Sequence, residues 1–79
     1  MERNEILKRV NDVFIDVLEE EIIIKEEYSS NDIDGWDSLT HIILIVESEK
    51  KFNIKFISSE IISWENIGEM IDCIEEKIK

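Results

Sequence analysis

The 79-residue sequence contains no proline, only two glycines and a single cysteine, Cys73. A lone cysteine cannot form an intramolecular disulfide, and no cluster of residues has metal-ligand spacing, so we expect neither a disulfide nor a metal site. The stability must instead come from one apolar core. Hydrophobic residues make up 43% of the sequence, which is enough to build one. We therefore expect one domain spanning residues 1–79.

Long apolar runs are absent as well, because no stretch approaches the roughly 18 residues that a membrane-spanning helix needs. The first five residues are rich in charge and do not have the pattern of a signal peptide. A single cysteine also suits a reducing compartment. We therefore expect a cytoplasmic protein without a membrane span.

Basic residues are scarce, since nine Lys and Arg stand against 20 Asp and Glu and give a formal net charge of −11. Such a surface repels nucleic acid and anionic lipid headgroups. It attracts basic protein surfaces and speeds encounter with them. We expect a monomer whose partners are proteins and not nucleic acids.

Apolar residues recur at spacings of three and four over residues 4–18 and 39–51 and from Ile67 onward, which predicts three long helices. Asn66 is the expected cap of the last helix, with Glu69 three residues later in the manner of a capping box. Serines at 58 and 59 predict the cap of a short helix of one or two turns. The predicted fold is all-α, a small four-helix bundle with a long loop between the first two helices.

That long loop comprises residues 19–37 and is acidic and rich in turn-forming residues. Ile22-Ile23-Ile24 is expected to run extended, with its isoleucines filling the core. Ile33 and Trp36 are the expected apolar anchors, and Trp36 is assigned to loop packing. A loop of this length in so small a domain indicates a functional segment.

Ser38 stands where this loop meets the second helix, which is apolar almost all round in its first half. Asp37 or Ser38 is the expected cap of that helix. Backbone N–H groups at a helix start lack partners within the helix, and the helix dipole favours negative charge there. A phosphate ester on Ser38 would therefore lie in a favourable field.

The chain resembles an acyl carrier protein over nearly its whole length. The resemblance rests on Asp37-Ser38-Leu39 at the head of the second helix, on the isoleucine-rich continuation, and on Phe52 fourteen residues after the serine. Size, acidity and the order of the helices agree with it.

The resemblance implies that a phosphopantetheinyl transferase attaches 4′-phosphopantetheine from coenzyme A to Ser38, using Mg²⁺ that Asp37 helps to hold. The thiol of this arm would hold acyl or aminoacyl groups as thioesters, and the chain would be a carrier, not an enzyme. Partner ligases or synthases with basic surfaces would dock on the second helix and the loop before it. The expected recognition residues are Asp34, Asp37, Leu39, Ile43 and Glu47. The walls of an acyl pocket would be Leu39, Ile42, Ile57, Ile61 and Ile62.

The first turns after the serine read Thr40-His41-Ile42-Ile43, where typical fatty-acid carriers place acidic residues. The run from Gly35 to His41 looks more like stand-alone carriers of specialised pathways, such as polyketide, aminoacyl and surface-polysaccharide assembly.

Two other interpretations remain open. In the first, the chain is an acidic helical adaptor in which Ser38 only caps a helix. In the second, Ser38 and His41 form a small hydrolase, although no third group orients the histidine. We place His41 on the exposed side of its helix, Trp64 in the core, and Cys73 in a buried or half-buried, unreactive position.

Overall fold

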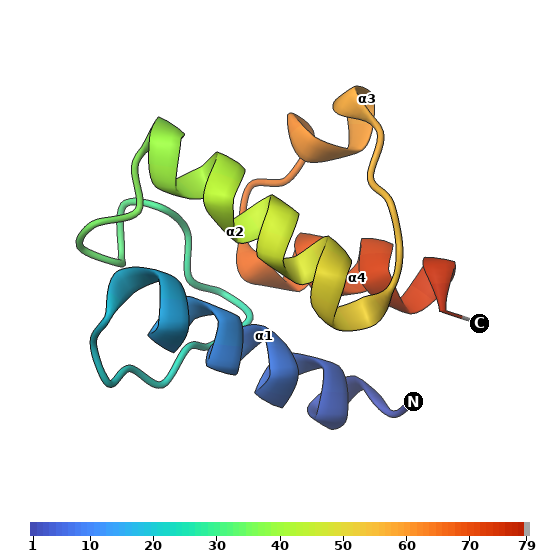
Figure 1. The fold of residues 1–79 in the computed structure, drawn as a ribbon, viewed down its shortest axis with the longest axis horizontal. Helices are drawn as coiled ribbons and strands as arrows, with labels where there is room; N and C mark the ends of the chain where they lie inside the picture. The colour runs from blue at the N-terminus through green and yellow to red at the C-terminus, as the bar shows by residue number, and fades with distance from the viewer. Residues whose placement is uncertain (79) are drawn as a thin grey trace.

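The computed structural model describes residues 1–78, and these form four helices: α1 (Arg3–Leu18), α2 (Ser38–Phe52), α3 (Ser58–Ile61) and α4 (Ile67–Lys77) (Figure 1). The predicted all-α bundle of three long helices and one short helix is confirmed. The helix expected from Ile67 onward ends at Lys77, and Lys79 lies outside the described residues. No helix in the described part of the chain is long and apolar enough to cross a bilayer.

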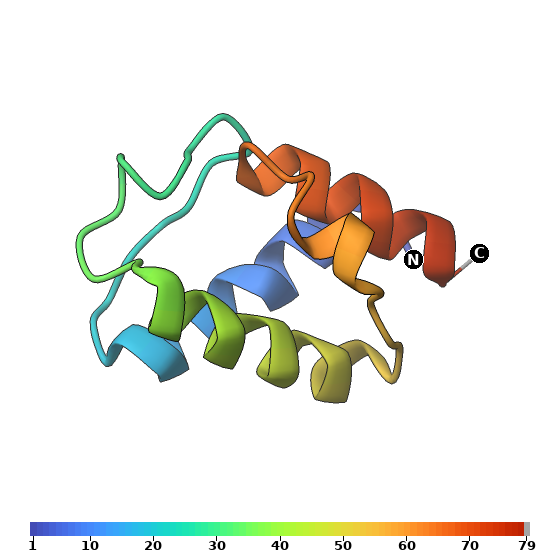
Figure 2. The ribbon, with the colours of Figure 1, turned by 90° about the horizontal axis from the view of Figure 1, so that it is seen from above.

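The core lies between the three long helices, because α1 packs against both α2 and α4 (Figure 2). The apolar stripe predicted for α1 is buried from Ile6 to Phe14 and partly buried in the last turn, and the stripe of α4 closes the core from the other side. Each methylene removed from water in this way contributes about 0.8 kcal/mol. The buried residues of the three helices are Ile6, Val10, Val13, Phe14, Leu44, Ile45, Phe52, Ile67, Met70, Ile71 and Ile74.

The loop between α1 and α2 is held by buried side chains and by α1 itself. Ile24 and Ile33 are buried at 3% and 4% exposure. The side-chain amide of Asn11 donates to the Ile22 carbonyl and accepts from the Ile24 N–H, which fixes the extended segment. The expectation that all three isoleucines fill the core is wrong for Ile23, which is 82% exposed because alternate side chains of an extended segment point in opposite directions.

The same loop also contacts the start of α4. The Gly68 N–H donates to the Glu26 carbonyl at 2.8 Å, and the Ile67 N–H donates to the Tyr28 carbonyl at 2.9 Å. A Cβ atom at Gly68 would lie 3.2 Å from that Glu26 oxygen. A side chain at this position would need the loop to shift by a few tenths of an ångström. The loop also supplies partners for N–H groups that a helix start leaves free.

The short helix α3 is tied to α4. Its Glu60 carboxylate accepts from the Ile57 N–H at 2.9 Å and forms an ion pair with Lys77 at 2.9 Å. Ser58 is the first residue of α3, so the expected serine cap is wrong, since Ile57 occupies the cap position. Because α3 is only four residues long, the ion pair with Lys77 helps to hold it against α4.

Candidate functional site

Ser38 is the first residue of α2 and is exposed to solvent. Its hydroxyl makes no hydrogen bond within the described residues, so it is free to react. The helix behind it is 15 residues long, and its dipole places partial positive charge at this end.

Asp37, and not Ser38, caps α2. Its backbone is extended, with φ −112° and ψ −173°, and its side chain accepts a 2.8 Å hydrogen bond from the Thr40 N–H. This hydrogen bond holds the pKa of Asp37 below its usual value. Since Asp37 supplies the cap, Ser38 does not have the capping role that the adaptor interpretation gives it.

Gly35 and Trp36 direct the loop into this helix. Gly35 has a φ of +88°, a backbone conformation that residues with a Cβ atom rarely adopt. Trp36 then turns inward, where its ring meets the edge of the Phe14 ring at a centroid distance of 5.2 Å. The predicted packing role of Trp36 is confirmed, and this contact anchors the segment just before Ser38 to α1.

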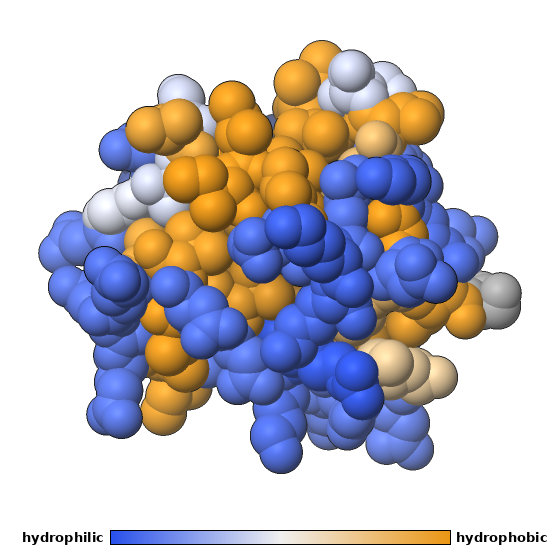
Figure 3. Space-filling view, in the orientation of Figure 1, coloured by the Kyte–Doolittle hydropathy of each residue, from blue (hydrophilic) through white to orange (hydrophobic). Residues whose placement is uncertain are grey.

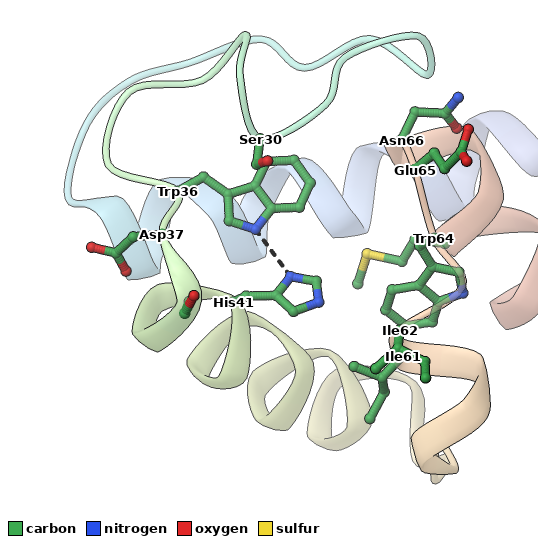
Figure 4. A pocket seen from close by; sticks show the side chains of 11 residues that line it. Ser30, Trp36, Asp37, His41, Ile61, Ile62, Trp64, Glu65 and Asn66 are labelled. Atoms are coloured by element: carbon green, nitrogen blue, oxygen red, sulfur yellow. Dashed lines mark hydrogen bonds between the residues drawn. The ribbon is translucent and has the colours of Figure 1, made fainter.

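His41 lies between the loop and α3. Its Nδ1 accepts a 3.0 Å hydrogen bond from the Trp36 indole N–H, its ring stacks on Trp36, and it meets the Trp64 ring at 6.2 Å (Figure 4). Burial lowers the pKa of His41, and a backbone hydrogen bond with Ile61 offsets this only in part. The predicted exposed position is therefore wrong, because the imidazole is half-buried and is held by its hydrogen bond to the Trp36 indole.

This arrangement also speaks against a Ser38–His41 hydrolase. The Nδ1 atom that could act as a base is already occupied by the indole N–H of Trp36. No hydrogen bond joins Ser38 to His41 within residues 1–78. A nucleophilic serine requires such a base within hydrogen-bonding reach.

A cavity of about 510 Å³ opens beside Ser38 (Figure 4). The loop, the start of α2, the α3 segment and the start of α4 all contribute to it. The lining comprises Ser30, Trp36, Asp37, Ser38, His41, Ile61, Ile62, Trp64, Glu65, Asn66 and Met70.

Only Ile61 and Ile62 of the five expected pocket walls line this cavity. Leu39, Ile42 and Ile57 are 70%, 59% and 60% exposed and lie outside the lining. The expectation that these three residues form pocket walls is therefore wrong. The first half of α2 is apolar on almost every side, so the sequence does not show which side faces inward. Sequence reasoning missed His41 and Trp64 as lining residues, because their contacts come from segments distant in sequence.

The outward side chains form an apolar patch on α2 and at the two ends of α3. Figure 3 shows hydrophobic surface gathered over these helices. The patch consists of Leu39, Ile42, Ile43, Val46, Ile57 and Ile62, each 41% exposed or more. Exposed apolar surface of this kind marks interaction sites in small proteins.

The acidic recognition residues expected from the sequence stand around this patch. Asp34 and Asp37 are exposed in the loop before α2, and Glu47 is half-buried in the third turn. Leu39 and Ile43 belong to the patch itself, at 70% and 42% exposure. The structure thus brings the five residues to the same helix and its preceding loop.

Three further expectations from the sequence concern Cys73, a metal site and Trp64. Cys73 is half-buried, and burial raises the pKa of its thiol to about 11. No group of three or more His, Cys, Asp or Glu side chains among residues 1–78 could hold a metal ion. Trp64, expected in the core, is half-buried at the edge of the core and packs against Phe56 at 4.9 Å.

Comparison with known proteins identifies the family. No protein-family model matches the chain. Acyl carrier proteins from two strains of Porphyromonas gingivalis are each 33% identical over 78 residues, covering 96% of this chain and 99% of the relative. The chain belongs to the acyl carrier protein family. The predicted family and carrier role are confirmed.

A solved structure supports the fold independently. The solution NMR structure of a holo acyl carrier protein from Geobacter metallireducens matches with a TM-score of 0.84 and 37% sequence identity. The match covers 91% of this chain and 84% of that chain. This protein therefore has the helical bundle of acyl carrier proteins, and its role is that of a carrier.

Proposed function

We propose that this acyl carrier protein bears 4′-phosphopantetheine on Ser38 and carries acyl or aminoacyl groups on it between partner enzymes. The observation that carries the proposal is the free, exposed hydroxyl of Ser38 at the start of a 15-residue helix. A holo relative with 37% identity supports the choice of prosthetic group. When attached, this group supplies a thiol that holds the cargo as a thioester.

The residues around Ser38 suit such a group. A phosphodiester keeps a negative charge, which a helix start at the surface stabilises by about 0.3–1 kcal/mol. The cavity next to the hydroxyl gives the arm apolar and aromatic surface to lie on. Asp37 uses one carboxylate oxygen, Oδ1, for the Thr40 N–H. The other oxygen can help hold Mg²⁺ while a transferase is bound, since carboxylates suit hard cations.

The proposed docking surface for the transferase and for ligases or synthases is α2 with its preceding loop. Leu39 and Ile43 provide the apolar contact at its centre, as interface anchors do. Asp34, Asp37 and Glu47 attract basic groups on the partner. Because each exposed ion pair contributes only about 0–1 kcal/mol, this docking is fast and reversible, as transfer between enzymes requires.

We also propose a specialised pathway in the cytoplasm. The first two turns of α2 carry no acidic residue, and Ile43 stands where fatty-acid carriers present an acid. The single cysteine is unpaired and its thiol is protonated at neutral pH, which suits a reducing compartment.

The test is a reaction of the purified protein with coenzyme A, Mg²⁺ and a broad-specificity phosphopantetheinyl transferase, followed by intact-mass measurement. The wild type is expected to gain one phosphopantetheine group, and Ser38→Ala none. Ser30→Ala is a matched control, since Ser30 is exposed and lines the same cavity. An unmodified wild type, or a modified Ser38→Ala, would refute the assignment.

A further inference from the structure

The charge of this protein is distributed unevenly along the chain. Residues 38–64, which include α2 and α3, contain as many lysines as acidic residues and are therefore formally neutral. The net charge of −11 lies wholly in residues 1–37 and 65–79. The neutral stretch also carries the whole apolar patch (Figure 3). Its charged residues are Glu47, Glu49, Lys50, Lys51, Lys55 and Glu60.

One face of α2 shows how this surface changes along the helix. The exposed apolar residues Leu39, Ile43 and Val46 follow one another at spacings of four and three, so they lie along one face. Lys50 comes four residues after Val46 and continues the same face. At a rise of about 1.5 Å per residue, Lys50 lies about 17 Å along the helix from Leu39. The face therefore runs from the Ser38 end over three apolar side chains to a lysine.

The end of α2 that is distant from Ser38 presents positive charge. Lys50 and Lys51 are exposed in the last turn of the helix. Lys50 pairs with Glu47 at 3.6 Å, whereas Lys51 forms no ion pair within residues 1–78. The carboxylate of Glu49 is turned towards the segment after the helix, where it accepts a hydrogen bond from a backbone N–H at 2.8 Å. Positive charge at this end is therefore open to a partner.

The Ser38 end of the same face is negative. Asp34 and Asp37 are exposed there, and neither forms an ion pair in the described part of the chain. A partner surface that is basic along its whole length would be attracted at this end and repelled by the lysines at the other. Charge complementarity therefore favours a partner whose own charge changes sign along the contact.

We propose that the partner enzyme of this carrier presents an apolar strip with basic groups where it meets the Ser38 end of α2 and acidic groups where it meets Lys50 and Lys51. The inference rests on the proposed attachment to Ser38. Because the two ends of the face differ in charge, only one direction of α2 along the partner matches both ends. The two lysines thus orient the carrier, and with it the arm on Ser38.

A second copy of the chain is the competing occupant of this face. Two α2 helices packed antiparallel would also bring opposite charges together. The net charge of −11 on each copy opposes that contact, whereas a partner enzyme need not carry such a charge. The face is therefore assigned to an enzyme and not to a dimer.

The experiment measures docking through the rate of a crosslinking reaction. The full chain is loaded from a coenzyme A analogue with an arm whose end alkylates a cysteine. The basic probe is a ketosynthase with an active-site cysteine and a basic docking surface. The swapped probe is the same enzyme with glutamate in place of those basic residues of that surface that are farthest from its active-site entrance. The preference is the ratio of the rate with the swapped probe to the rate with the basic probe.

The decisive carrier variant is Lys50→Glu with Lys51→Glu. It is expected to lower the preference by about tenfold at low salt, because two exposed charge pairs change from attraction to repulsion. The effect should shrink in about 0.5 M salt, where such charges are screened. Comparing both carriers with both probes cancels any loss of activity that the swap causes in the ketosynthase.

A matched control changes the net charge equally at another place. Lys8→Glu with Lys25→Glu alters two exposed lysines on α1 and in the loop, and it should leave the preference unchanged. Lys50→Gln with Lys51→Gln should give about half of the logarithmic effect and avoids placing negative charge at the end of the α2 dipole. Circular dichroism checks that each variant is folded.

Several results would overturn the proposal. An unchanged preference in both variants of Lys50 and Lys51 would leave these lysines with a role only at the helix end. An equal shift in the control would assign the effect to net charge. A wild-type dimer in sedimentation that Lys50→Glu with Lys51→Glu abolishes would assign the face to a second copy. Intact mass, recorded before crosslinking, tests the attachment separately: a chain that takes up no arm would refute it, and the proposed orientation would fall with it.

Discussion

Replacing Asp37 by alanine should destabilise the fold, whereas replacing Ser38 should not. In the structure the Asp37 side chain accepts from the Thr40 N–H at 2.8 Å, while the Ser38 hydroxyl has no partner within residues 1–78. Loss of such a cap costs about 0.5–2 kcal/mol, typically about 1. In a domain of this size that corresponds to a drop in Tm of about 4–8 °C per kcal/mol. Ser38→Ala should remain within about 0.5 kcal/mol of the wild type.

Asp37→Asn separates the cap from its charge. Asparagine caps helices about as well as aspartate, so this variant should keep the cap and lose only the interaction between the negative charge and the helix dipole. The hydrogen bond to Thr40 lowers the pKa of Asp37. The carboxylate therefore contributes its stability above its unfolded pKa of about 3.9, and the contribution is lost as the pH falls through the lower folded value. The difference between wild type and Asp37→Asn should thus shrink in acid.

The assay is urea unfolding of the apo protein followed by far-ultraviolet circular dichroism, at pH 7 and at several values below 4.5. The slope of the transition should be equal in all variants, so that midpoints report stability alone. The reasoning is refuted if Ser38→Ala loses as much stability as Asp37→Ala. That result would place the cap on the serine and remove the argument that its hydroxyl is free.

Two further predictions concern the segment around this cap. Gly35→Ala should lower the free energy of unfolding by about 1 kcal/mol or more, because Gly35 has a φ of +88°; urea unfolding that shows no loss would contradict the strained turn. Burial lowers the pKa of His41, so the unfolded chain binds its proton more readily and stability should fall as the pH drops below about 6.5. His41→Gln should flatten this slope between pH 7 and 5, and an unchanged slope would show that another group causes it.

The helices could be predicted because their signals are local. The stripes of α1 and α4 alternate with polar residues at helical spacing, so the inward face is fixed by the sequence itself. Asn66 was predicted as the cap of α4 from its residue type, and its side chain does accept from the Glu69 N–H. Asn53 ends α2 with a φ of 56°, a left-handed conformation that asparagine adopts more readily than most residues at this position of a helix.

The lining of the cavity could not be predicted, because α2 gives no such signal. Its first half is apolar in almost every direction, so the sequence cannot show that Leu39 and Ile42 point outward and His41 inward. The inward orientation of His41 depends on Trp36 in the loop, whose indole N–H donates a hydrogen bond to the imidazole. Gly68 is a similar case, since the close contact that a side chain there would meet comes from the distant Glu26 carbonyl and not from its own helix.

The apolar patch and the strong acidity are best understood together. A small domain that exposes six large apolar side chains on α2 and at the ends of α3 would tend to associate with its own copies. The net charge of −11 opposes this, because two copies brought together at the patch would repel each other. The same charge attracts a partner with basic groups around an apolar face. Acidity therefore does more than steer the encounter, since it keeps the patch beside Ser38 available for enzymes that the carrier must meet.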